Sequence, residues 1–489
     1  MGRVLKSLAK CCRIEGPEDV HITGLALDSR LVKPGFLFAA LPGTRYDGLQ
    51  FVADALERGA RALLVKENAQ LPPLPEGVAV VRAARPAQAL AHIAARYYVH
   101  MPVTIVAVTG TNGKSSVAEF TRQIWTFMGF RAASMGTLGV KGPEDLHDLN
   151  VSHTTPDVIT LHEVLAKMRR RGISHLAMEA SSHGLAQYRM DGVRLTAGGY
   201  THLSRDHLDY HGDMDAYFAA KMRLFEELLT PPAPAVVNMD GARAEEVAAL
   251  AASRGLRVFG VGAAGDRLKI LSRRLEGLGQ HLHIRGRNRE YRIFLPLVGT
   301  FQAENALLAA GLVIAAGGPE EEAVLGLERL RGARGRMELV GRTRPGAAVF
   351  VDYAHTPDAL RQALAALRPY VKGRLVVVFG AGGDRDAGKR PQMGAVAAEL
   401  ADVVIVTDDN PRSEDPAEIR AQVLAGCPGA QEIGNRAEAI AAAISMLRAG
   451  DILLVAGKGH ETGQIVGDEV LAFSDHEEIE RCLKAEEGA

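Results

Sequence analysis

One segment of this chain, residues 106–116, has the residue types and spacing that suit binding of a nucleotide triphosphate. An apolar run over 103–108 predicts a buried strand, which leads into a glycine-containing loop that ends in Gly-Lys-Ser. Apolar residues at helical spacing from Val117 to Phe127 then predict a helix. A strand, a glycine loop and a helix in this order direct backbone N–H groups and the helix N-terminus towards phosphate oxygens.

Two side chains of this phosphate loop supply chemistry that a triphosphate needs. Lys114 is expected to reach the β- and γ-phosphate oxygens, and the Ser115 hydroxyl is expected to bind Mg²⁺. The common pattern has a glycine where this chain has Val108; Gly110 stands nearer to Gly113, so the loop is a shortened variant. The alternative is an ordinary strand-to-helix turn with a chance Gly-Lys-Ser. The residues expected to hold the nucleotide are Gly110, Thr111, Asn112, Gly113, Lys114, Ser115 and Ser116.

A second polar region follows two further predicted strands. The strand over 175–179 ends at Glu179, and the strand over 197–201 leads into a loop that contains His207. The carboxyl ends of parallel strands meet at one edge of a sheet, where a carboxylate and an imidazole can bind Mg²⁺. Zinc is an alternative because His207 and His211 are four residues apart, but the residues around them disfavour a continuous helix and no third ligand is evident. A polar surface loop without a ligand is the remaining alternative.

Lys221 stands on the apolar stripe of a predicted helix over 214–229, between Phe218 and Phe225. One interpretation is that its stem packs in the core while its amine reaches water. The other is that the amine is buried, which favours its neutral and nucleophilic form. A neutral lysine can take up CO₂, and the carboxylate of the resulting carbamate could help to hold a metal.

Three predicted strands near the C-terminus, 375–379, 403–407 and 452–456, end in loops of complementary charge. Arginine pairs with a carboxylate through two parallel hydrogen bonds, and a glutamate suits an ammonium group. Together the loops predict a site for a zwitterionic amino acid. Their charged and amide side chains are those of Asp384, Arg385, Asp408, Asp409, Asn410, Arg412, Lys458 and Glu461.

The elements that position these residues form an α/β chain of about three domains, given its 489 residues. Strands and helices alternate over 101–335, which predicts a mainly parallel sheet, while finer alternation over 262–297 predicts an antiparallel extension. Shorter strands and a helix occupy 1–100, and a fresh α/β pattern begins at 336 and continues to 489.

The composition is that of a globular protein, with 47% hydrophobic residues and a formal net charge of −1, so nucleic acid and membrane partners are not expected. The four cysteines, of which Cys11 and Cys12 are adjacent, lack metal-ligand spacing and suit a reducing cytoplasm. The N-terminus lacks the apolar core of a signal peptide, and the longest small-apolar run, 306–318, is too short to span a bilayer.

Taken together, these motifs resemble the Mur ligases of bacterial peptidoglycan synthesis. The resemblance extends over nearly the whole chain, from Asp28-Ser29-Arg30 to Gly457-Lys458-Gly459-His460-Glu461, with the motifs in the family's order. It implies a UDP-sugar-binding domain over 1–100, a central P-loop ATPase domain over 101–335 and a C-terminal, dinucleotide-fold-like, amino-acid-binding domain over 336–489.

The resemblance also implies an ATP-dependent amide ligase. Such an enzyme would add meso-2,6-diaminopimelate to UDP-N-acetylmuramoyl-L-alanyl-D-glutamate through an acyl phosphate, with Mg²⁺ as cofactor. The expected partners are these small molecules alone, and a cytoplasmic monomer that serves cell wall biogenesis, cell shape and cell division is expected. The alternatives are a sister ligase that adds L-lysine, a folate polyglutamate-type synthetase, or a nucleotide-driven switch.

Site residues are carried over by motif. Ser29 and the loop over 43–48 are expected to contact the UDP group. His153-Thr154-Thr155-Pro156 resembles the family's Asn-Thr-Thr-Pro, with a histidine in place of the asparagine, and the phosphate loop has Ser116 where the family commonly has threonine. The residues expected to contact the muramyl peptide are Thr154, Thr155, Ser181, Gln187 and Arg189.

The remaining assignments follow the same resemblance. The expected catalytic residues are Lys114, Glu179, His207 and Lys221, the last as a CO₂-derived carbamate; Ser115, Glu179, His207 and carbamylated Lys221 are the expected metal ligands. The adenine- and ribose-side wall is expected from Asn305, Arg336, Asp352 and His355. Diaminopimelate is expected at Arg385, Asp409, Asn410, Pro411, Arg412, Gly457 and Glu461. The extra carboxylate of diaminopimelate is a natural partner for Arg412, which would reject lysine if left unpaired.

Overall fold

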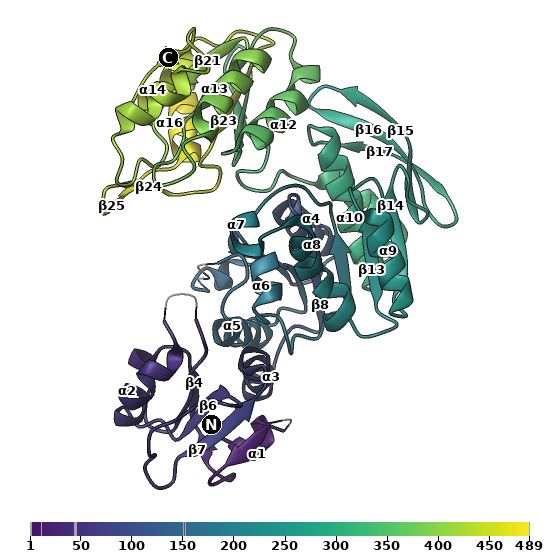
Figure 1. Ribbon diagram of the computed structural model, residues 1–489. Coiled ribbons are helices and arrows are strands. Elements are labelled where there is room, and N and C mark those ends of the chain that lie inside the picture. The colour runs from purple at the N-terminus through teal and green to yellow at the C-terminus, as the bar shows by residue number, and fades with distance from the viewer. Residues whose placement is uncertain (1, 11, 44–45, 150, 152, 489) are drawn as a thin grey trace. The chain divides into compact units, whose positions relative to one another are not determined.

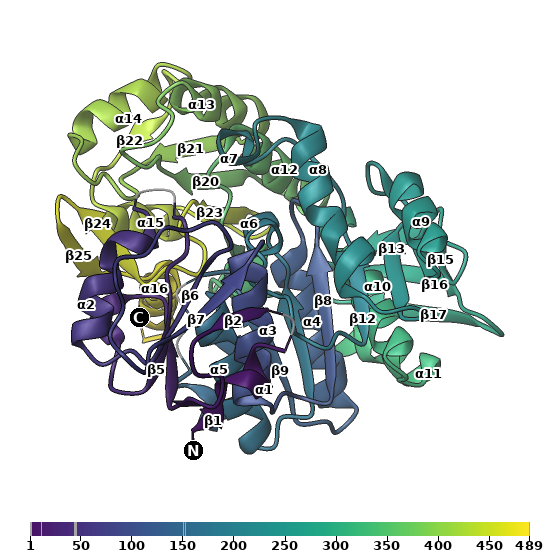
Figure 2. The same ribbon diagram turned by 60° about the horizontal axis from the view of Figure 1, so that its bottom comes forward.

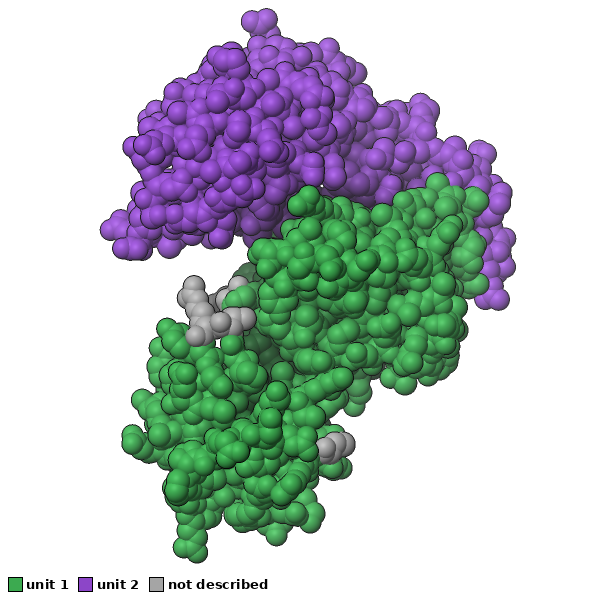
Figure 3. Space-filling model, in the orientation of Figure 1, with its two compact units in different colours: residues 1–269, 307–326 green, residues 270–306, 327–489 purple. Residues whose placement is uncertain are grey.

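The computed structural model describes every residue except 1, 11, 44, 45, 150, 152 and 489. Cys11 and two residues of the loop over 43–48 therefore lie outside the described residues. The chain divides into two units, one of residues 1–269 and 307–326 and one of residues 270–306 and 327–489 (Figure 3). No helix within the described ranges is both long and apolar enough to span a bilayer.

The N-terminal part of unit 1 contains a five-stranded sheet in the order β2-β7-β6-β5-β4 (Figure 2). Strands β4 to β7 are parallel and β2 runs antiparallel at the edge. Alternate residues of β6 face opposite layers, so Leu64 packs with α1 and α3 while Leu63 packs with α2. The bounds are α1 Leu5–Leu8, β2 Arg13–Glu15, β4 Gly24–Ala26, β5 Phe36–Ala39, α2 Val52–Glu57, β6 Ala62–Lys66, β7 Ala79–Ala83 and α3 Pro86–Tyr98.

The larger sheet of unit 1 has the order β10-β9-β11-β8-β12-β13-β14, with its strands parallel except for β10. Strand β8 lies between β11 and β12, and in this register Glu179 is opposite Val108 while Tyr200 is opposite Thr109. The carboxyl ends of these three strands therefore lie side by side, as the sequence predicted. The bounds are β8 Thr104–Thr109, β9 Ala132–Gly136, β10 Gly139–Lys141, β11 His175–Glu179, β12 Ala197–Tyr200, β13 Pro234–Asn238 and β14 Arg257–Gly262.

Helices cover this sheet. Ile105 and Ala107 of β8 pack in one core with residues of α5, α8 and α9 (Figure 1). The helix predicted over 214–229 is α-helical only to Arg223 and ends in a π-helical turn, Leu224–Leu228. The bounds are α4 Lys114–Phe127, α5 Val158–Arg170, α6 Ser182–Ala186, α7 Leu208–His211, α8 Met214–Arg223 and α9 Ala244–Ser253.

Unit 2 begins within β15 (Leu268–Glu276) and continues into β16 (Gly279–Arg285) and β17 (Glu290–Leu295). Strands β16 and β17 pair antiparallel, which confirms the prediction made from their fine hydrophobic alternation. Helix α10 (Thr300–Ala315) begins in unit 2 and continues into unit 1.

The remainder of unit 2 contains a six-stranded sheet in the order β18-β19-β23-β20-β21-β22, parallel except for β18. Val377 of β20 packs with α12, α13 and α14, whereas its neighbour Val378 packs with α15 and α16 on the other face (Figure 2). The bounds are β18 Glu338–Arg342, β19 Ala348–Asp352, α12 Pro357–Leu367, β20 Leu375–Phe379, α13 Lys389–Leu400, β21 Val403–Val406, α14 Pro416–Leu424, β22 Gln431–Glu432, α15 Arg436–Ser445, β23 Ile452–Ala456, β24 Gly463–Val466, β25 Glu469–Ala472 and α16 Asp475–Gly488.

Candidate functional site

The phosphate loop leaves β8 at Thr109 and enters α4 at Lys114, as predicted. Gly110 has φ +140°, and a Cβ there would lie 1.8 Å from Oγ1 of Thr201. This position therefore accepts only glycine, both for its backbone conformation and for the close approach of Thr201, the residue after β12. The conformation of the shortened loop therefore depends on the neighbouring segment of chain as well as on its own glycine.

The loop over 201–204, which follows β12, holds the phosphate loop through four hydrogen bonds. The Thr111 N–H donates to the His202 carbonyl (2.8 Å), and the Thr201 hydroxyl donates to the Asn112 carbonyl (2.7 Å). The Thr111 hydroxyl donates to the Ser204 carbonyl (3.1 Å) and accepts from the Ser204 N–H (2.9 Å). The cradle is thus pre-organised, and Ser115 and Ser116 lie in the first turn of α4.

Two lysine amines converge on this cradle. Nζ of Lys114 donates to the carbonyl oxygens of Gly110 (3.0 Å) and Thr111 (2.6 Å), and Nζ of Lys221 donates to the same Gly110 oxygen (2.7 Å). Lys221 is only 1% exposed, so its amine does not reach water as the snorkelling interpretation requires. The ring of Tyr217 lies 4.2 Å from that amine, and the Tyr217 hydroxyl donates to Thr111 Oγ1 (3.3 Å).

The electrostatics of this pair favour one neutral amine. Burial lowers the pKa of Lys221 well below its ordinary value; the charge of Lys114 lowers it further, and Asp206 acts in the opposite direction. Burial and the same two lysines lower the pKa of His202 to about 4, so its imidazole is neutral at physiological pH. Lys221 is therefore suited to react with CO₂.

Glu179 is 2% exposed at the end of β11 and is oriented by Thr137. Its Oε1 accepts from the Thr137 N–H (2.7 Å) and its Oε2 from the Thr137 hydroxyl (3.2 Å). The same hydroxyl lies 3.0 Å from Oγ1 of Thr154, and the Thr155 hydroxyl donates to the Glu179 carbonyl (3.1 Å). The structure thus joins Glu179 to Thr154 through Thr137 and to Thr155 directly; Thr137 was not predicted from the sequence.

The other residues predicted to contact the muramyl peptide belong to the same network. The Ser181 hydroxyl donates to Oγ1 of Thr155 (3.0 Å), and Nη1 of Arg189 donates to the Thr155 carbonyl (2.7 Å). Arg189 also donates to Oε1 of Gln187, whose amide donates to the hydroxyl of Tyr210. Tyr210 was not predicted, because its ring carries no motif.

Ser29 lies elsewhere, in the N-terminal part of unit 1. It is 5% exposed, and its hydroxyl bonds to Asp54, whose pKa is lowered by this contact and by Arg58. No hydrogen bond between Ser29 and the Thr155 network occurs among the described residues. The structure therefore does not bring this predicted UDP contact together with the rest of the set.

His207 differs from the other predicted metal ligands. Its backbone is left-handed (φ +52°), its side chain is 48% exposed, and its Nε2 lies 3.6 Å from Asp206. Its ring lies 4.8 Å from that of His183 and joins an aromatic cluster with His211. In the described part of the chain, no three His, Cys, Asp or Glu residues are grouped as a metal site, so the zinc alternative gains no support.

In unit 2 the four residues predicted for the adenine and ribose side are linked by hydrogen bonds to one another's chain neighbours and by one stacking contact. Asn305 donates to Oε1 of Gln302 (3.1 Å), and Gln302 donates to the Arg336 carbonyl (3.3 Å). The Asp352 carboxylate accepts from the N–H groups at 337 (2.7 Å) and 354 (2.9 Å), and burial raises its pKa. The Arg336 guanidinium stacks on the ring of Tyr353, 4.5 Å from its centroid, and Nδ1 of His355 lies 2.8 Å from the Tyr353 carbonyl.

The loops predicted to select the amino acid lie together at the carboxyl edge of the sheet in unit 2. Nη1 of Arg412 donates to the Gly383 carbonyl (2.7 Å), whose own N–H donates to the Asn410 carbonyl (2.9 Å). Gly457 has φ +114°, and a Cβ there would lie 2.3 Å from Oδ2 of Asp409. The structure therefore joins residues from all three strand ends; the Arg385 side chain is exposed, and Pro411 is buried beside Arg412.

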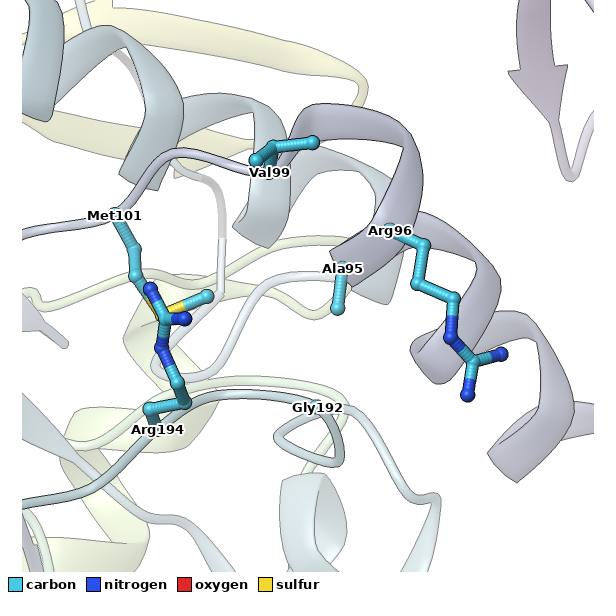
Figure 4. Close-up of a pocket in the computed structure, with 6 residues that line it drawn as sticks. All are labelled: Ala95, Arg96, Val99, Met101, Gly192 and Arg194. Atoms are coloured by element: carbon cyan, nitrogen blue, oxygen red, sulfur yellow. The ribbon is translucent and has the colours of Figure 1, made fainter. Parts of the chain in front are cut away.

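A hollow at the C-terminal end of α3 is lined by none of the predicted site residues (Figure 4). Ala95, Met101 and Gly192 line it, and Arg194 beside it is exposed. It marks the junction between the five-stranded sheet and the larger sheet of unit 1.

Parallel α/β sheets with a phosphate loop beside a buried lysine define a nucleotide-binding protein. The chain belongs to the Mur ligase family. Residues 21–98 match the model described as Mur ligase family, catalytic domain; residues 108–313 match the Mur ligase middle domain; and residues 335–459 match the Mur ligase, glutamate ligase domain.

Sequence and structure comparisons with individual proteins indicate the same family. The UDP-N-acetylmuramoyl-L-alanyl-D-glutamate–2,6-diaminopimelate ligase of Bradyrhizobium diazoefficiens is 54% identical over 470 residues, covering 95% of each chain. A solved structure of a ligase of the same name has a TM-score of 0.73, 33% identity and full coverage of both chains. A Mycobacterium tuberculosis folylpolyglutamate synthase complexed with ADP has a TM-score of 0.60 and 21% identity, covering 76% of this chain and 90% of that one, and shares the fold alone.

Proposed function

We propose that this protein is the ligase that adds meso-2,6-diaminopimelate to UDP-N-acetylmuramoyl-L-alanyl-D-glutamate. The observation that carries the proposal is the convergence of Lys114 and Lys221 on Gly110, next to the strand end that presents Glu179. Relatives about half identical over nearly the whole chain carry this enzyme's name.

The reaction has two steps. A carboxylate oxygen of the D-glutamate side chain attacks the γ-phosphorus of ATP, giving an acyl phosphate and ADP. The amino group of diaminopimelate then attacks the acyl carbon, an amide bond forms, and inorganic phosphate leaves with the electron pair of the broken C–O bond. The amine gives up one proton during this second step.

Residues of unit 1 serve the first step. The backbone of 110–116 and the N-terminus of α4 would bind the phosphates, and Lys114 would exchange its carbonyl contacts for phosphate oxygens. Thr154, Thr155, Ser181, Gln187 and Arg189 would hold the muramyl peptide, with Ser29 at the UDP end. The hydrogen-bond network that joins the first five of these residues to Glu179 supports this grouping.

Mg²⁺ fits the donor chemistry of this region. The hydroxyl of Ser115 and the carboxylate of Glu179 offer the oxygen ligands that a hard cation prefers, and phosphate oxygens ordinarily complete its shell. His207 and a carbamate on Lys221 would contribute further. When bound, the cation would neutralise charge on the transferring phosphoryl group. The carbamate forms when the neutral amine of Lys221 bonds to the carbon of CO₂ and releases one proton.

Residues of unit 2 serve the nucleoside and the incoming amino acid. Asn305, Arg336, Asp352 and His355 would line the adenine and ribose side. Diaminopimelate would be bound by Arg385, Asp409, Asn410, Pro411, Arg412, Gly457 and Glu461. The arginines suit its carboxylates, and Glu461 suits an ammonium group.

The proposal also covers the domain organisation, the oligomeric state and the cellular location of the enzyme. The domains are the UDP-sugar-binding domain over 1–100, the ATPase domain over 101–335 and the amino-acid-binding domain over 336–489. The enzyme works as a cytoplasmic monomer on small molecules, without nucleic acid or membrane partners, and contributes to cell shape and cell division through cell wall biogenesis.

The deciding experiment measures phosphate release from ATP. We expect release only when UDP-muramyl-dipeptide and diaminopimelate are both present, and its near loss in Lys114→Ala. Equal release without either substrate would refute the ligase, and equal turnover with L-lysine would refute the proposed role of Arg412. Turnover with a folate substrate in place of the muramyl dipeptide would favour the folate-type alternative.

A further inference from the structure

Lys458 is a fully buried cation between two residues of the proposed amino-acid site. Its side chain is 0% exposed, and its Nζ donates to Oδ1 of Asn410 (2.9 Å) and to Oε2 of Glu461 (3.3 Å). The Asp409 carboxylate lies 3.9 Å from the same amine. Burying an ammonium group without compensation is costly, so these polar partners are needed to hold Lys458 in its buried position.

This lysine determines which way the amide of Asn410 is turned. Oδ1 of Asn410 accepts from Nζ of Lys458 and also from the Ile465 N–H (3.0 Å). Both of those groups can only donate, so the oxygen must face them and the Nδ2 group must face the other way. Nδ2 accordingly donates to Oε2 of Glu461 (2.9 Å).

The same contacts orient Glu461. Its Oε2 accepts from both Asn410 and Lys458. Among the described residues no hydrogen bond to its Oε1 occurs, and its side chain is 31% exposed. Glu461 is therefore held by one oxygen and presents the other to solvent or to a ligand.

The charges around Lys458 suit a cationic group of a ligand. The amine of Lys458 lies between two carboxylates, Asp409 and Glu461. Burial raises the pKa of Asp409, whereas the charges of Arg436 and Lys458 act in the opposite direction. The adjacent buried pair of Arg436 and Asp475, joined at 2.7 Å with both side chains 0% exposed, is neutral. The second oxygen of Glu461 is therefore a suitable acceptor for an ammonium group of a ligand.

We propose that Lys458 is a positioning residue for the amino-acid substrate. By fixing the amide of Asn410 and one oxygen of Glu461, it holds Oε1 of Glu461 ready to accept from the substrate's ammonium group. This inference rests on the proposed function. It adds to the amino-acid site a residue whose amine contacts the side chains expected to bind the substrate, and not the substrate itself.

The test compares apparent KM values for diaminopimelate and ATP in the full-length enzyme. Lys458→Met removes the charge and both hydrogen bonds at similar length. We expect its KM for diaminopimelate to rise about tenfold or more, the cost of losing charged hydrogen bonds, while its KM for ATP changes less than about twofold. Arg374→Met is the matched control, since Arg374 pairs with buried Asp451 (2.7 Å) at the opposite edge of the same sheet. We expect both of its KM values to stay near wild type.

An unchanged KM for diaminopimelate in Lys458→Met, or equal rises in both KM values, would overturn the inference, because the second result indicates a merely structural role. If Lys458→Met does not fold, Lys458→Arg retains the charge, and its broader guanidinium cannot take the amine's place between Asn410 and Glu461. The same selective rise is then expected, and its absence refutes the proposal. Failure of the wild-type enzyme to use diaminopimelate would instead refute the proposed function.

Discussion

Lys114 and Lys221 share one acceptor, the carbonyl oxygen of Gly110, at 3.0 and 2.7 Å. Two ammonium groups on one oxygen repel each other, and the more deeply buried one gives way by losing its proton. That one is Lys221, whose pKa is lowered well below its ordinary value by burial first and by Lys114 second. The loop proposed to bind phosphate therefore also lowers the pKa of an amine next to it, which favours the nucleophilic form of Lys221.

Lys221→Ala should nearly abolish ligase activity and leave the fold intact. Among the described residues, the amine of Lys221 donates to the carbonyl of Gly110 and lies over the ring of Tyr217, so its loss removes the carbamate, these two contacts and some buried volume. Native mass spectrometry of the wild-type enzyme should show the added mass of one CO₂, and the variant should lack it. Full activity in Lys221→Ala would eliminate the carbamate from the mechanism.

Lys221→Met should make the protein more stable at neutral pH when CO₂ is excluded. The pKa of the amine is lower in the folded state than in the unfolded state, so the unfolded chain binds the proton more tightly. The free energy of unfolding of the wild type is therefore reduced at pH values below the unfolded-state pKa, most strongly at and below the folded-state pKa, and it recovers as pH rises through the unfolded value. Chemical denaturation across pH should show a gap between variant and wild type that closes at alkaline pH; a gap independent of pH would contradict the argument.

Much of this site follows from the sequence because the positions and ends of the strands follow from the hydrophobic pattern. The runs before Gly110 and Glu179 predicted parallel strands whose loops share one edge of the sheet, and the two strands do pair in parallel. The hydrogen-bond partners of Glu179 and Thr111 could not be predicted from the sequence. Thr137 comes after β9 and Tyr217 lies within α8, and neither belongs to a motif; only the folded chain brings them to Glu179 and Thr111.

The burial of Lys458 was equally hard to predict from the sequence. Lys458 lies between Gly457 and Glu461, both predicted to bind the amino acid, yet its residue type alone suggests an exposed cation. Its burial depends on acceptors at Asn410 and Glu461, which come from two different strand ends. Such contacts depend on tertiary geometry, which residue spacing does not specify.

Tyr217→Phe should weaken ATP binding without loss of the fold. Burial raises the pKa of Tyr217 to about 12, so its hydroxyl is a donor at physiological pH, and it bonds to Thr111 in the phosphate loop. Loss of one such bond costs about 1 kcal/mol, which corresponds to about a fivefold rise in KM for ATP. Tyr200→Phe is the control, since its hydroxyl bonds to the carbonyl of Ala242 (2.8 Å) and not to the loop. Equal effects of the two variants would exclude a specific role for Tyr217.

Arg412→Lys should mainly raise the apparent KM for diaminopimelate. The backbone of Arg412 is left-handed (φ +53°) and fixed by β24, since its N–H donates to the Ile465 carbonyl (3.0 Å) and its carbonyl accepts from the Gly467 N–H (2.7 Å). The guanidinium, anchored by the Gly383 carbonyl, retains donors for a carboxylate.

A lysine at this position offers a point charge in place of the planar fork, so about a tenfold rise in KM for diaminopimelate is expected, with kcat affected less. Arg361→Lys provides the control, because Arg361 pairs with Glu399 on the exposed side of α12 and α13. Steady-state kinetics with each amino acid measures both effects. A KM for diaminopimelate equal to wild type in Arg412→Lys would remove this residue from the amino-acid site, whereas improved use of L-lysine would strengthen its role in rejecting that substrate.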